Sequence, residues 1–258
     1  MDRTLKTRIK KRELTIGSWL SLSHAPICEM MAQAGFDWLV IDMEHTNIDY
    51  QTATDMIRII ELSKCIPLVR VGENSPTIIK RVMDSGAHGV LVPMVNTREE
   101  AQKAVDSVYY PPAGKRGVGL FRAQNYGSSF QEYKEWLEKE AIVIVQIEHI
   151  KAVENLTDIL SVGGVDGFII GPYDLSASLR LPGQFEHKLV KAALEEVERV
   201  MINHKKVGGS HIVHPSQDDL NYKIKQGYKF IAYGVDMIFF SEKLNQEIRS
   251  VYEVKDKD

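Results

Sequence analysis

A single (β/α)₈ TIM barrel is the fold class that the sequence predicts for residues 1–258, on three observations. Short apolar runs, typical of strands buried on both faces, alternate with amphipathic helical patterns along the whole chain. Eight such pairs in 258 residues match the usual size of this barrel. An open doubly wound sheet is the alternative, but its Gly-x-Gly-x-x-Gly is absent, because Gly117-Val118-Gly119 lacks the third glycine. No linker or low-complexity tract divides the chain, so we expect one domain.

The expected elements follow one another in strict alternation. Strands are expected at residues 15–21, 38–42, 66–71, 89–95, 142–148, 167–174, 206–213 and 229–236. Helices are expected at residues 26–34, 49–62, 76–85, 97–110, 151–161, 186–204, 215–226 and 241–254. Ser75-Pro76 and Asn96-Thr97 carry the usual signals of a helix start. Gly35, Gly86 and Gly227 follow helices at positions where a left-handed cap is needed.

Two segments fall outside this alternation. Residues 111–122 form a long irregular stretch, followed by a short helical pattern near residues 129–138. Loops of this length in a compact barrel are usually functional or lid-like, and a solvated connector fits the composition equally well. The first dozen residues are basic and lead into no apolar segment, so we expect a solvated basic helix there rather than a signal peptide.

Composition narrows the class of protein. Thirty-two Lys and Arg against 35 Asp and Glu give a net charge of −3, which provides no electrostatic case for binding nucleic acid. No apolar stretch is long enough to predict a membrane span. Cys28 and Cys65 lack metal-ligand spacing and are interpreted as reduced residues at packing positions. These features predict a cytoplasmic protein that binds neither nucleic acid nor membrane.

Two of the apolar runs end in an acid. The run at residues 142–147 ends at Glu148, and the run that begins at Gly167 ends at Asp174. Burying a carboxylate is costly unless a cation or a hydrogen-bond donor meets it, and the carboxyl ends of barrel strands carry the catalytic groups. Two carboxylates at this end are typical of a Mg²⁺ or Mn²⁺ site. The other interpretation, in which each acid is exposed or caps the next helix, stays open from spacing alone.

Two further strand ends carry candidate catalytic side chains. Arg70 ends an apolar run, and its charge suits either a substrate carboxylate or enolate oxygen, or an internal salt bridge to one of the acids. His45 follows another run and is the best candidate for proton transfer, since its unperturbed pKa lies near neutrality. Either Asp42 or Glu44 could orient it.

The remaining basic side chains favour metal chemistry over a Schiff base. A Schiff-base aldolase needs a lysine towards the catalytic mouth, whereas Lys206 and Lys229 lie at the amino ends of their strands. His211 and His214 are three residues apart, which places them on opposite faces of a strand and argues against a metal pair.

Five segments together resemble one known family. They are AGFDWLVIDMEH at residues 34–45, RVMDSGAHGVLVPMV at 81–95, the stretch from Tyr110-Pro111-Pro112 to Arg122-Ala123, QIE at 146–148 and IGPYDLS at 170–176. In this order, over about residues 5–240, the chain resembles the HpcH/HpaI aldolases. The resemblance implies a class II, metal-dependent pyruvate aldolase on a (β/α)₈ barrel. It also implies a homohexamer whose C-terminal helix is exchanged between neighbouring subunits.

The resemblance implies roles for individual residues. Glu148 and Asp174 would bind a divalent metal cation (Mg²⁺, Mn²⁺ or Co²⁺), which pyruvate chelates through its carboxylate and keto oxygens. Arg70 would steady the keto or enolate oxygen, and Gln146 would line the same pocket. The rest of the pocket is assigned to Trp19, Gly171, Pro172 and Tyr173.

The resemblance also implies the groups that complete catalysis. His45, supported by Asp42, would serve proton transfer, and Asp84 matches a residue contributed across a subunit interface. Two departures leave the aldehyde open: Tyr173 stands where many members carry a small residue, and Ser210-His211 replaces a more aliphatic stretch.

The function expected from these residues is reversible cleavage of a 4-hydroxy-2-oxo acid to pyruvate and an aldehyde. Two alternatives remain. One is a malyl- or citryl-thioester lyase on the same barrel, which would usually bring an arginine-rich CoA surface and a longer chain. The other is a non-catalytic barrel that binds a metabolite.

Overall fold

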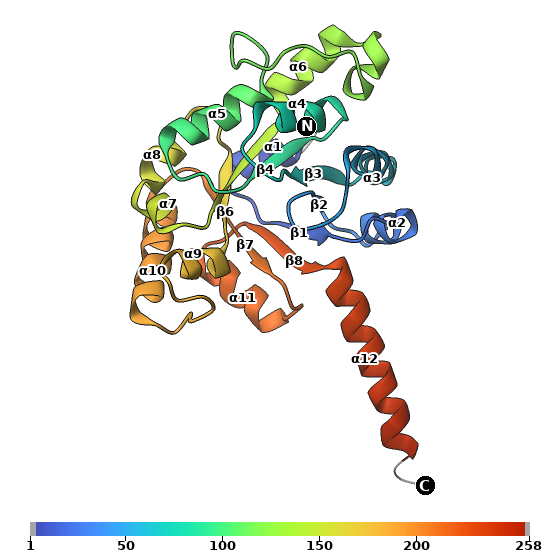
Figure 1. Ribbon diagram of the computed structural model, residues 1–258, viewed down its shortest axis with the longest axis vertical. Helices are drawn as coiled ribbons and strands as arrows, with labels where there is room; N and C mark the ends of the chain where they lie inside the picture. Colours follow the sequence, from blue (N-terminus) through green and yellow to red (C-terminus); the bar gives the residue numbers. More distant parts are fainter. Residues whose placement is uncertain (1–3, 256–258) are drawn as a thin grey trace.

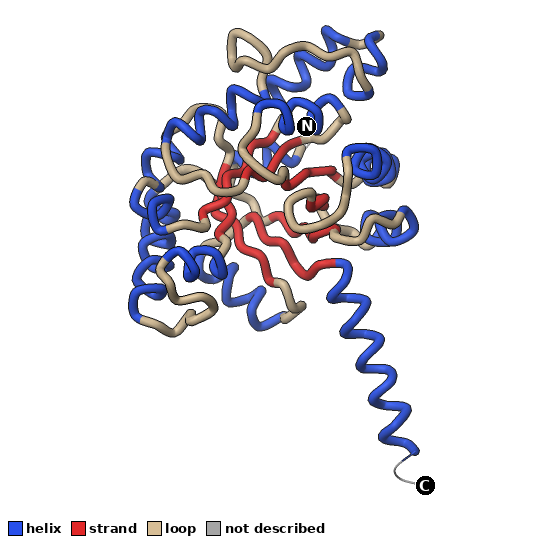
Figure 2. Tube along the Cα trace, in the orientation of Figure 1, coloured by secondary structure: helices blue, strands red, loops and turns tan. Residues whose placement is uncertain are grey.

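The computed structural model describes residues 4–255, and the side chains of residues 4–252. Eight parallel strands close into a barrel in which β1 pairs with both β2 and β8. The strands are β1 (Thr15–Leu20), β2 (Trp38–Asp42), β3 (Ile66–Arg70), β4 (Gly89–Val92), β5 (Ile142–Ile147), β6 (Gly167–Ile170), β7 (Val207–Ile212) and β8 (Phe230–Val235). Helices surround the ring of strands (Figures 1 and 2). The expected barrel is confirmed.

The helices occupy the connections between strands. They are α1 (Leu5–Lys10), α2 (Ala25–Gln33), α3 (Tyr50–Leu62), α4 (Pro76–Asp84), α5 (Arg98–Val108), α6 (Phe130–Glu140), α7 (Ile150–Glu154), α8 (Leu156–Ser161), α9 (Pro172–Ser178), α10 (Lys188–Asn203), α11 (Gln217–Gln226) and α12 (Asp236–Lys255). A 3₁₀ helix, η1 (Arg122–Gly127), precedes α6. Thr97 and Glu100 form a complete capping box at the start of α5. Within residues 4–255, no helix combines the length and hydrophobicity that crossing a membrane requires.

The barrel interior is filled by apolar side chains and closed at its amino end by α1. Trp38 stacks on Phe230 with ring centroids 4.0 Å apart, and Leu5 and Ile9 of α1 join this interior cluster. Lys6 is buried on the same face of α1, where its Nζ lies 2.6 Å from Oδ2 of Asp166. The expectation of a solvated first helix was therefore wrong, because three of its six residues face the barrel. Cys28 and Cys65 are buried and form no disulfide, as expected.

Several element ends differ from the expected ones. β4 ends at Val92 and β6 at Ile170, rather than at residues 95 and 174. Pro172 occupies the first turn of α9, because its ring fixes a backbone angle compatible with a helix and removes a donor from the sheet. The helix expected at residues 151–161 is broken into α7 and α8 at Asn155. The last helix begins at Asp236, five residues before the expected start.

The long irregular stretch does not cover the carboxyl ends of the strands. It connects α5 to β5, so it lies at the opposite, amino end of the barrel, together with η1 and α6 (Figure 1). Arg122 donates to the carbonyl of Ser85 and pairs with Glu61, which ties the stretch to the ends of α4 and α3. Gly86 has a φ of 102°, and a Cβ there would meet the Arg122 guanidinium. The buried Arg116 and the paired Arg122 thus anchor the segment to the barrel, while most of its other residues are exposed.

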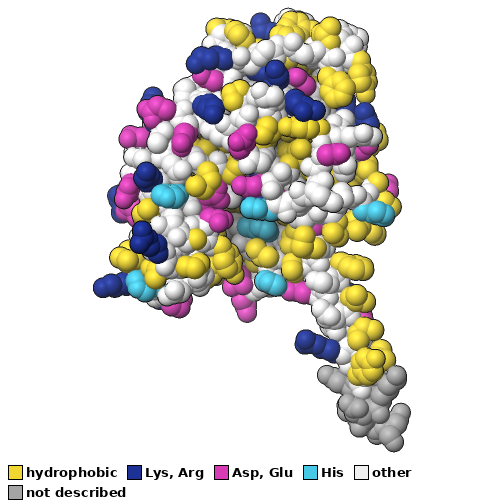
Figure 3. Space-filling view, viewed as in Figure 1, with side chains coloured by type: hydrophobic (Ala, Val, Ile, Leu, Met, Phe, Trp, Pro, Cys, Tyr) yellow, Lys and Arg dark blue, Asp and Glu magenta, His cyan; other side chains and the backbone are white. Residues whose placement is uncertain are grey.

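The last helix leaves the barrel. In Figure 1, α12 projects away from the strands as an isolated rod, and Figure 3 shows hydrophobic side chains along it. Phe240, Leu244, Ile248 and Val251 are all at least half exposed, at spacings that place them on one side of the helix.

Candidate active site at the barrel mouth

Arg70 and Asp42 lie side by side at the ends of β3 and β2. They are partners in the strand register, and Asp42 accepts from Nε and Nη2 of Arg70 at 2.9 and 2.6 Å. The third guanidinium nitrogen, Nη1, lies 3.2 Å from Glu44 Oε2. Both carboxylates and the guanidinium are largely buried. The internal salt bridge that the sequence left open is therefore present, and it holds Arg70 rigidly at the mouth.

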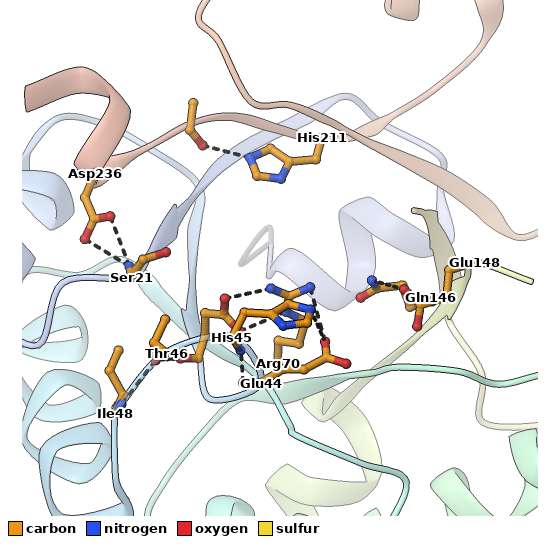
Figure 4. Close-up of polar contacts among 12 residues, drawn as sticks. Ser21, Glu44, His45, Thr46, Ile48, Arg70, Gln146, Glu148, His211 and Asp236 are labelled. Atoms are coloured by element: carbon orange, nitrogen blue, oxygen red, sulfur yellow. Dashed lines mark hydrogen bonds and ion pairs between the residues drawn. The ribbon is translucent and has the colours of Figure 1, made fainter. Parts of the chain in front are cut away.

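His45 lies beside this ion pair but is not supported by Asp42 in the expected way. Asp42 accepts from the backbone N–H groups of Glu44 and His45, at 3.0 and 3.3 Å, and so shapes the turn after β2. The imidazole Nε2 is instead 3.7 Å from Glu44 Oε2 (Figure 4). Burial raises the pKa of the Glu44 carboxyl, while Arg70 acts to lower it. The histidine side chain itself is 66% exposed, so it can exchange protons with a ligand or with water.

Glu148 lies on the other side of the mouth, at the end of β5. Its Oε1 accepts from the backbone N–H of Met94 at 2.6 Å, and its Oε2 accepts from the side-chain amide of Gln146. Burial, with a smaller contribution from the charge of Asp174, raises the pKa of Glu148. A Cβ at Gly171 would lie 3.0 Å from Oε2, which explains the glycine at this position. The carboxylate is therefore held in one orientation by two donors.

Asp174 approaches Glu148 from a helix rather than from a strand. The expectation that Asp174 ends a strand was wrong, because Pro172 and Asp174 both belong to the first turn of α9. Asp174 is exposed and has no hydrogen-bond or ion-pair partner among the described residues, yet its charge acts on Glu148. Tyr173, which lies between Pro172 and Asp174 in the sequence, is 64% exposed. Its ring packs edge-on against Phe185, with ring centroids 4.9 Å apart.

Trp19 and His211 form the apolar wall of the mouth. The guanidinium of Arg70 lies over the buried Trp19 indole, 5.3 Å from the ring centroid. The imidazole of His211 stacks on the same indole, with centroids 4.7 Å apart and planes at 14°. His211 Nε2 is 3.0 Å from the carbonyl oxygen of Gly234. Burial lowers the pKa of His211 to about 4, and the nearby Arg70 charge acts in the same direction.

The stability of the fold should fall in acid because of His211. Its pKa is about 4 when folded and about 6.5 when unfolded, so the unfolded chain takes up the proton first as the pH falls below about 6.5. This linkage should remove about 2 kcal/mol of unfolding free energy between about pH 7.5 and pH 5. Urea denaturation at both pH values should show a smaller loss for His211→Gln. An equal loss in the variant and the wild type would contradict the assignment.

Asp84 does not join this group within one chain. It is the last residue of α4, towards the amino end of the barrel, where its Oδ1 lies 4.0 Å from Nη2 of the buried Arg116. That oxygen is buried without a hydrogen-bond partner, and burial raises the pKa of the carboxyl. Its predicted catalytic role would therefore need the mouth of another subunit.

Sequence reasoning passed over Asp236 and the inward position of His211. Asp236 ends the β8 run and accepts from the backbone N–H groups of Ser21 and Leu22, at 3.0 and 2.8 Å, which fixes the loop after β1. An acid at the end of an apolar run was the signal used for Glu148, and it applies equally to Asp236. For His211 no signal was available, because period two gives alternation but not which residues face inward.

The oxygen donors around Glu148 fit a hard divalent cation. Glu148 accepts from Gln146, whose Oε1 is buried and has no hydrogen-bond partner, and the charge of Asp174 acts on Glu148. An unpartnered buried oxygen beside two carboxylates is the donor set that Mg²⁺ or Mn²⁺ prefers, and it contains no imidazole or thiolate. Among the residues described, no three His, Cys, Asp or Glu side chains are placed so that together they could hold a metal ion. Two carboxylates are thus the acidic core of any such site.

Acidic and histidine side chains gather at the mouth, near the centre of the barrel face (Figure 3). Figure 4 shows Glu148 and Gln146 on one side, Arg70, Glu44 and His45 together, and His211 across from them. Charged groups from several strand ends are the usual composition of an active site on this fold.

Comparison with known proteins identifies the family. The family model for HpcH/HpaI aldolase/citrate lyase matches residues 15–242. Two Escherichia coli proteins are each 36% identical to the chain. They are a 2-keto-3-deoxy-L-rhamnonate aldolase, with 96% of this chain and 92% of that protein covered, and a 5-keto-4-deoxy-D-glucarate aldolase, with 91% of each covered. A solved HpcH/HpaI aldolase/citrate lyase family protein from Burkholderia cenocepacia superimposes with a TM-score of 0.90 at 30% identity, over 96% of this chain and 98% of that one. This chain therefore belongs to the HpcH/HpaI aldolase/citrate lyase family and is a carbon–carbon lyase of the aldolase type.

Proposed function

We propose that this protein is a divalent-metal-dependent aldolase that reversibly cleaves a 4-hydroxy-2-oxo acid to pyruvate and an aldehyde. Aldolases of this family depend on a divalent metal. The observation that carries the proposal is Glu148, which is held at the mouth by the Met94 N–H and the Gln146 amide and is near enough to Asp174 and Arg70 for both charges to act on its pKa. The named relatives are aldolases that act, by their names, on keto-deoxy sugar acids.

Glu148 and Asp174 would hold the metal, with Gln146 Oε1 beside them. When bound, a divalent cation there supplies Lewis-acid polarisation of the 2-oxo group and compensates the negative charge that develops on it. Mg²⁺, Mn²⁺ and Co²⁺ are the candidate ions, and the all-oxygen donor set favours the first two.

Arg70 would stabilise the enolate oxygen. A guanidinium carries about five N–H donors in one plane. Nε and Nη2 each donate to Asp42, and Nη1 lies 3.2 Å from Glu44 Oε2, which leaves N–H groups on the same plane for a substrate oxygen. Because the two carboxylates fix the plane, the donors need no reorganisation when charge develops on the oxygen.

His45 would carry the proton. In the cleavage direction a base removes the C4 hydroxyl proton, the C4–O bond becomes a carbonyl, and the C3–C4 bond breaks. Its electron pair enters the 2-oxo group to give the pyruvate enolate, and the aldehyde leaves. His45 is exposed enough to take this proton, and Glu44, 3.7 Å away, would stabilise the imidazolium. Protonation of the enolate at C3 then gives pyruvate.

Arg70→Lys should lower kcat/KM by about 100-fold, since an ammonium group cannot satisfy Asp42 and Glu44 and also face the substrate oxygen. Steady-state kinetics of pyruvate addition to an aldehyde would measure this loss. Arg58→Lys is the matched control, because Arg58 pairs with Asp55 on the exposed face of α3. Activity of Arg70→Lys within about threefold of the wild type would exclude this role for Arg70.

The proposed reaction is tested by a screen of aldehydes with pyruvate and with Mg²⁺, Mn²⁺ or Co²⁺, read as formation of a new carbon–carbon bond. We expect at least one aldol product, and none after exhaustive chelation. Since the family also includes citrate lyases, acyl-CoA thioesters form a second arm of the screen. Cleavage of thioesters alone would favour the lyase alternative, and pyruvate binding without any turnover would favour the non-catalytic one.

We also propose that the active enzyme is a homo-oligomer, a hexamer by resemblance, in which α12 packs against a neighbouring subunit. The exposed apolar side of α12, with Phe240, Leu244 and Ile248, supports this proposal, as does the distance of Asp84 from the mouth of its own chain. Leu244→Glu with Ile248→Glu should reduce the mass measured by light scattering, since charges replace buried apolar contacts. An unchanged mass would contradict the exchange of α12.

A further inference from the structure

Arg116 is a buried cation whose hydrogen-bonding capacity is largely unused. Its side chain has no exposed surface, and its guanidinium lies over the rings of Tyr110 and Tyr133, 4.4 and 5.4 Å from their centroids. Nη2 donates to the Tyr133 hydroxyl at 2.9 Å, whereas Nε and Nη1 are buried without a hydrogen-bond partner among the described residues. A guanidinium with unpaired donors is costly to bury, which indicates a role beyond packing.

Asp84 is the carboxylate that lies closest to this cation. Its Oδ1 is 4.0 Å from Nη2 of Arg116, and no other carboxylate of residues 4–252 comes as near to the guanidinium. Like the guanidinium nitrogens, Oδ1 is buried without a hydrogen-bond partner among these residues. Oδ2 lies against the backbone of Gly119, where a Cβ would come within 2.7 Å of it. The carboxylate is therefore enclosed on two sides, with Arg116 on one of them.

The other charges around Asp84 are weaker or already engaged. Burial raises the pKa of this carboxyl, Arg116 acts most strongly to lower it, and Lys80 on the same helix does so less. The remaining charged and titratable side chains near it on packed elements are Tyr50, Asp55 and Arg58 of α3, Arg81 of α4 and Tyr133 of α6. Of the two arginines in this set, one pairs with an aspartate and the other lies over a tyrosine ring. Arg116 is thus the main group that favours the ionised carboxylate.

The proposed function needs a charged carboxylate at this position. Asp84 is expected to act at the mouth of a neighbouring subunit, and burial in such a contact makes the ionised form harder to maintain. A guanidinium keeps its proton in proteins, so Arg116 supplies a constant positive charge. The Tyr133 hydroxyl that accepts from Nη2 also donates to the carbonyl of Met83, one residue before Asp84. The cation and the carboxylate are therefore tied to the same end of α4.

We propose that Arg116 is a positioning residue for catalysis, which holds the carboxylate of Asp84 charged and fixed so that it can act at the mouth of a neighbouring subunit. This inference rests on the proposed aldolase function and on the role expected there for Asp84. Arg116 itself touches no substrate, since its side chain is fully buried. Loss of its charge should therefore affect the reaction only through Asp84.

The test is a double-mutant cycle on kcat at two pH values. Arg116→Gln should lower kcat of the aldol addition by about 10-fold at about pH 6 but by less than about threefold at about pH 8, because Asp84 without its cation still ionises at the higher pH. At the lower pH, Arg116→Gln combined with Asp84→Asn should be no slower than Asp84→Asn alone. Arg116→Lys keeps the charge and should stay within about threefold of the wild type at both pH values.

Lys115→Gln is the matched control, because the adjacent Lys115 is exposed and pairs with Asp106. A loss in Arg116→Gln that is equal at both pH values, or that adds to the loss in Asp84→Asn, would overturn the inference, and so would wild-type kcat in Asp84→Asn. If Arg116→Gln fails to fold, a folded Arg116→Lys decides, since a loss of about 10-fold in it rejects the role of the charge. A wild type without aldol activity with any ion defeats the proposed function and this inference together, whereas activity with an additive loss defeats this inference alone.

Discussion

Replacing Glu148 with glutamine is expected to lower kcat/KM for the aldol reaction by about 10³-fold. The carboxylate is held by the Met94 N–H and the Gln146 amide and faces the charge of Asp174. Glutamine keeps the shape but removes the negative charge that a divalent cation needs, so charge on the developing enolate would lose its main stabilisation. Asp174→Asn should have an effect of the same order.

The measurement pairs kinetics with metal binding. Mn²⁺ affinity, followed by electron paramagnetic resonance, should fall at least about 100-fold in Glu148→Gln together with the activity. Glu154→Gln is the matched control, since Glu154 is exposed on α7 six positions after Glu148. A thermal melt shows that each variant is folded. Wild-type metal affinity and activity in Glu148→Gln would remove Glu148 from the site.

The second large effect is on stability. Lys6→Met is expected to lower the unfolding free energy by about 3–5 kcal/mol, because it leaves a buried carboxylate without its cation. Nζ of Lys6 lies 2.6 Å from Oδ2 of Asp166 and 3.2 Å from the hydroxyl of Tyr109. The same Oδ2 accepts from the backbone N–H of Val143 at 2.9 Å, so Asp166 cannot turn towards water without breaking a further bond.

Thermal denaturation should show a midpoint lower by roughly 10 °C for Lys6→Met. Lys10→Met is the control on the same helix, because Lys10 is exposed and should change stability by less than about 0.5 kcal/mol. Adding Asp166→Asn to Lys6→Met should restore part of the loss by removing the unpaired charge. If Lys6→Met is as stable as Lys10→Met, the pair does not hold α1 to the barrel.

The barrel could be predicted from the sequence because its strands are buried on both faces. Runs such as residues 142–147 are continuous and apolar, so their number and order survive small errors at the ends. The predicted strand ends were wrong where the chain leaves the sheet without a change in composition. The strand expected at residues 167–174 ran past Pro172, where the chain already forms a helix, because proline fits both the end of a strand and the first turn of a helix.

The charged part of the candidate site was predictable, whereas its contacts were not. Asp42 and Arg70 end apolar runs, and only the register of β2 and β3 makes them a bidentate pair. Lys6 belongs to a basic segment whose composition predicts exposure to solvent. In the structure its Nζ instead donates to the buried Asp166, 160 positions away. His211 depends on which face of β7 turns inward. Each of these needs a contact between distant segments, which local sequence does not specify.

Exchange of the pyruvate methyl protons with deuterium, followed by NMR in D₂O, tests the central claim most directly, because it reports enolate formation without any aldehyde. With Mg²⁺ or Mn²⁺ the wild type should exchange these protons, and exchange should stop after exhaustive chelation and in Glu148→Gln and Asp174→Asn. Two results would contradict the proposal that Glu148, Asp174 and Arg70 form a metal-dependent enolisation site. One is exchange that continues at full rate after chelation, and the other is the absence of exchange with Mg²⁺, Mn²⁺ and Co²⁺ alike.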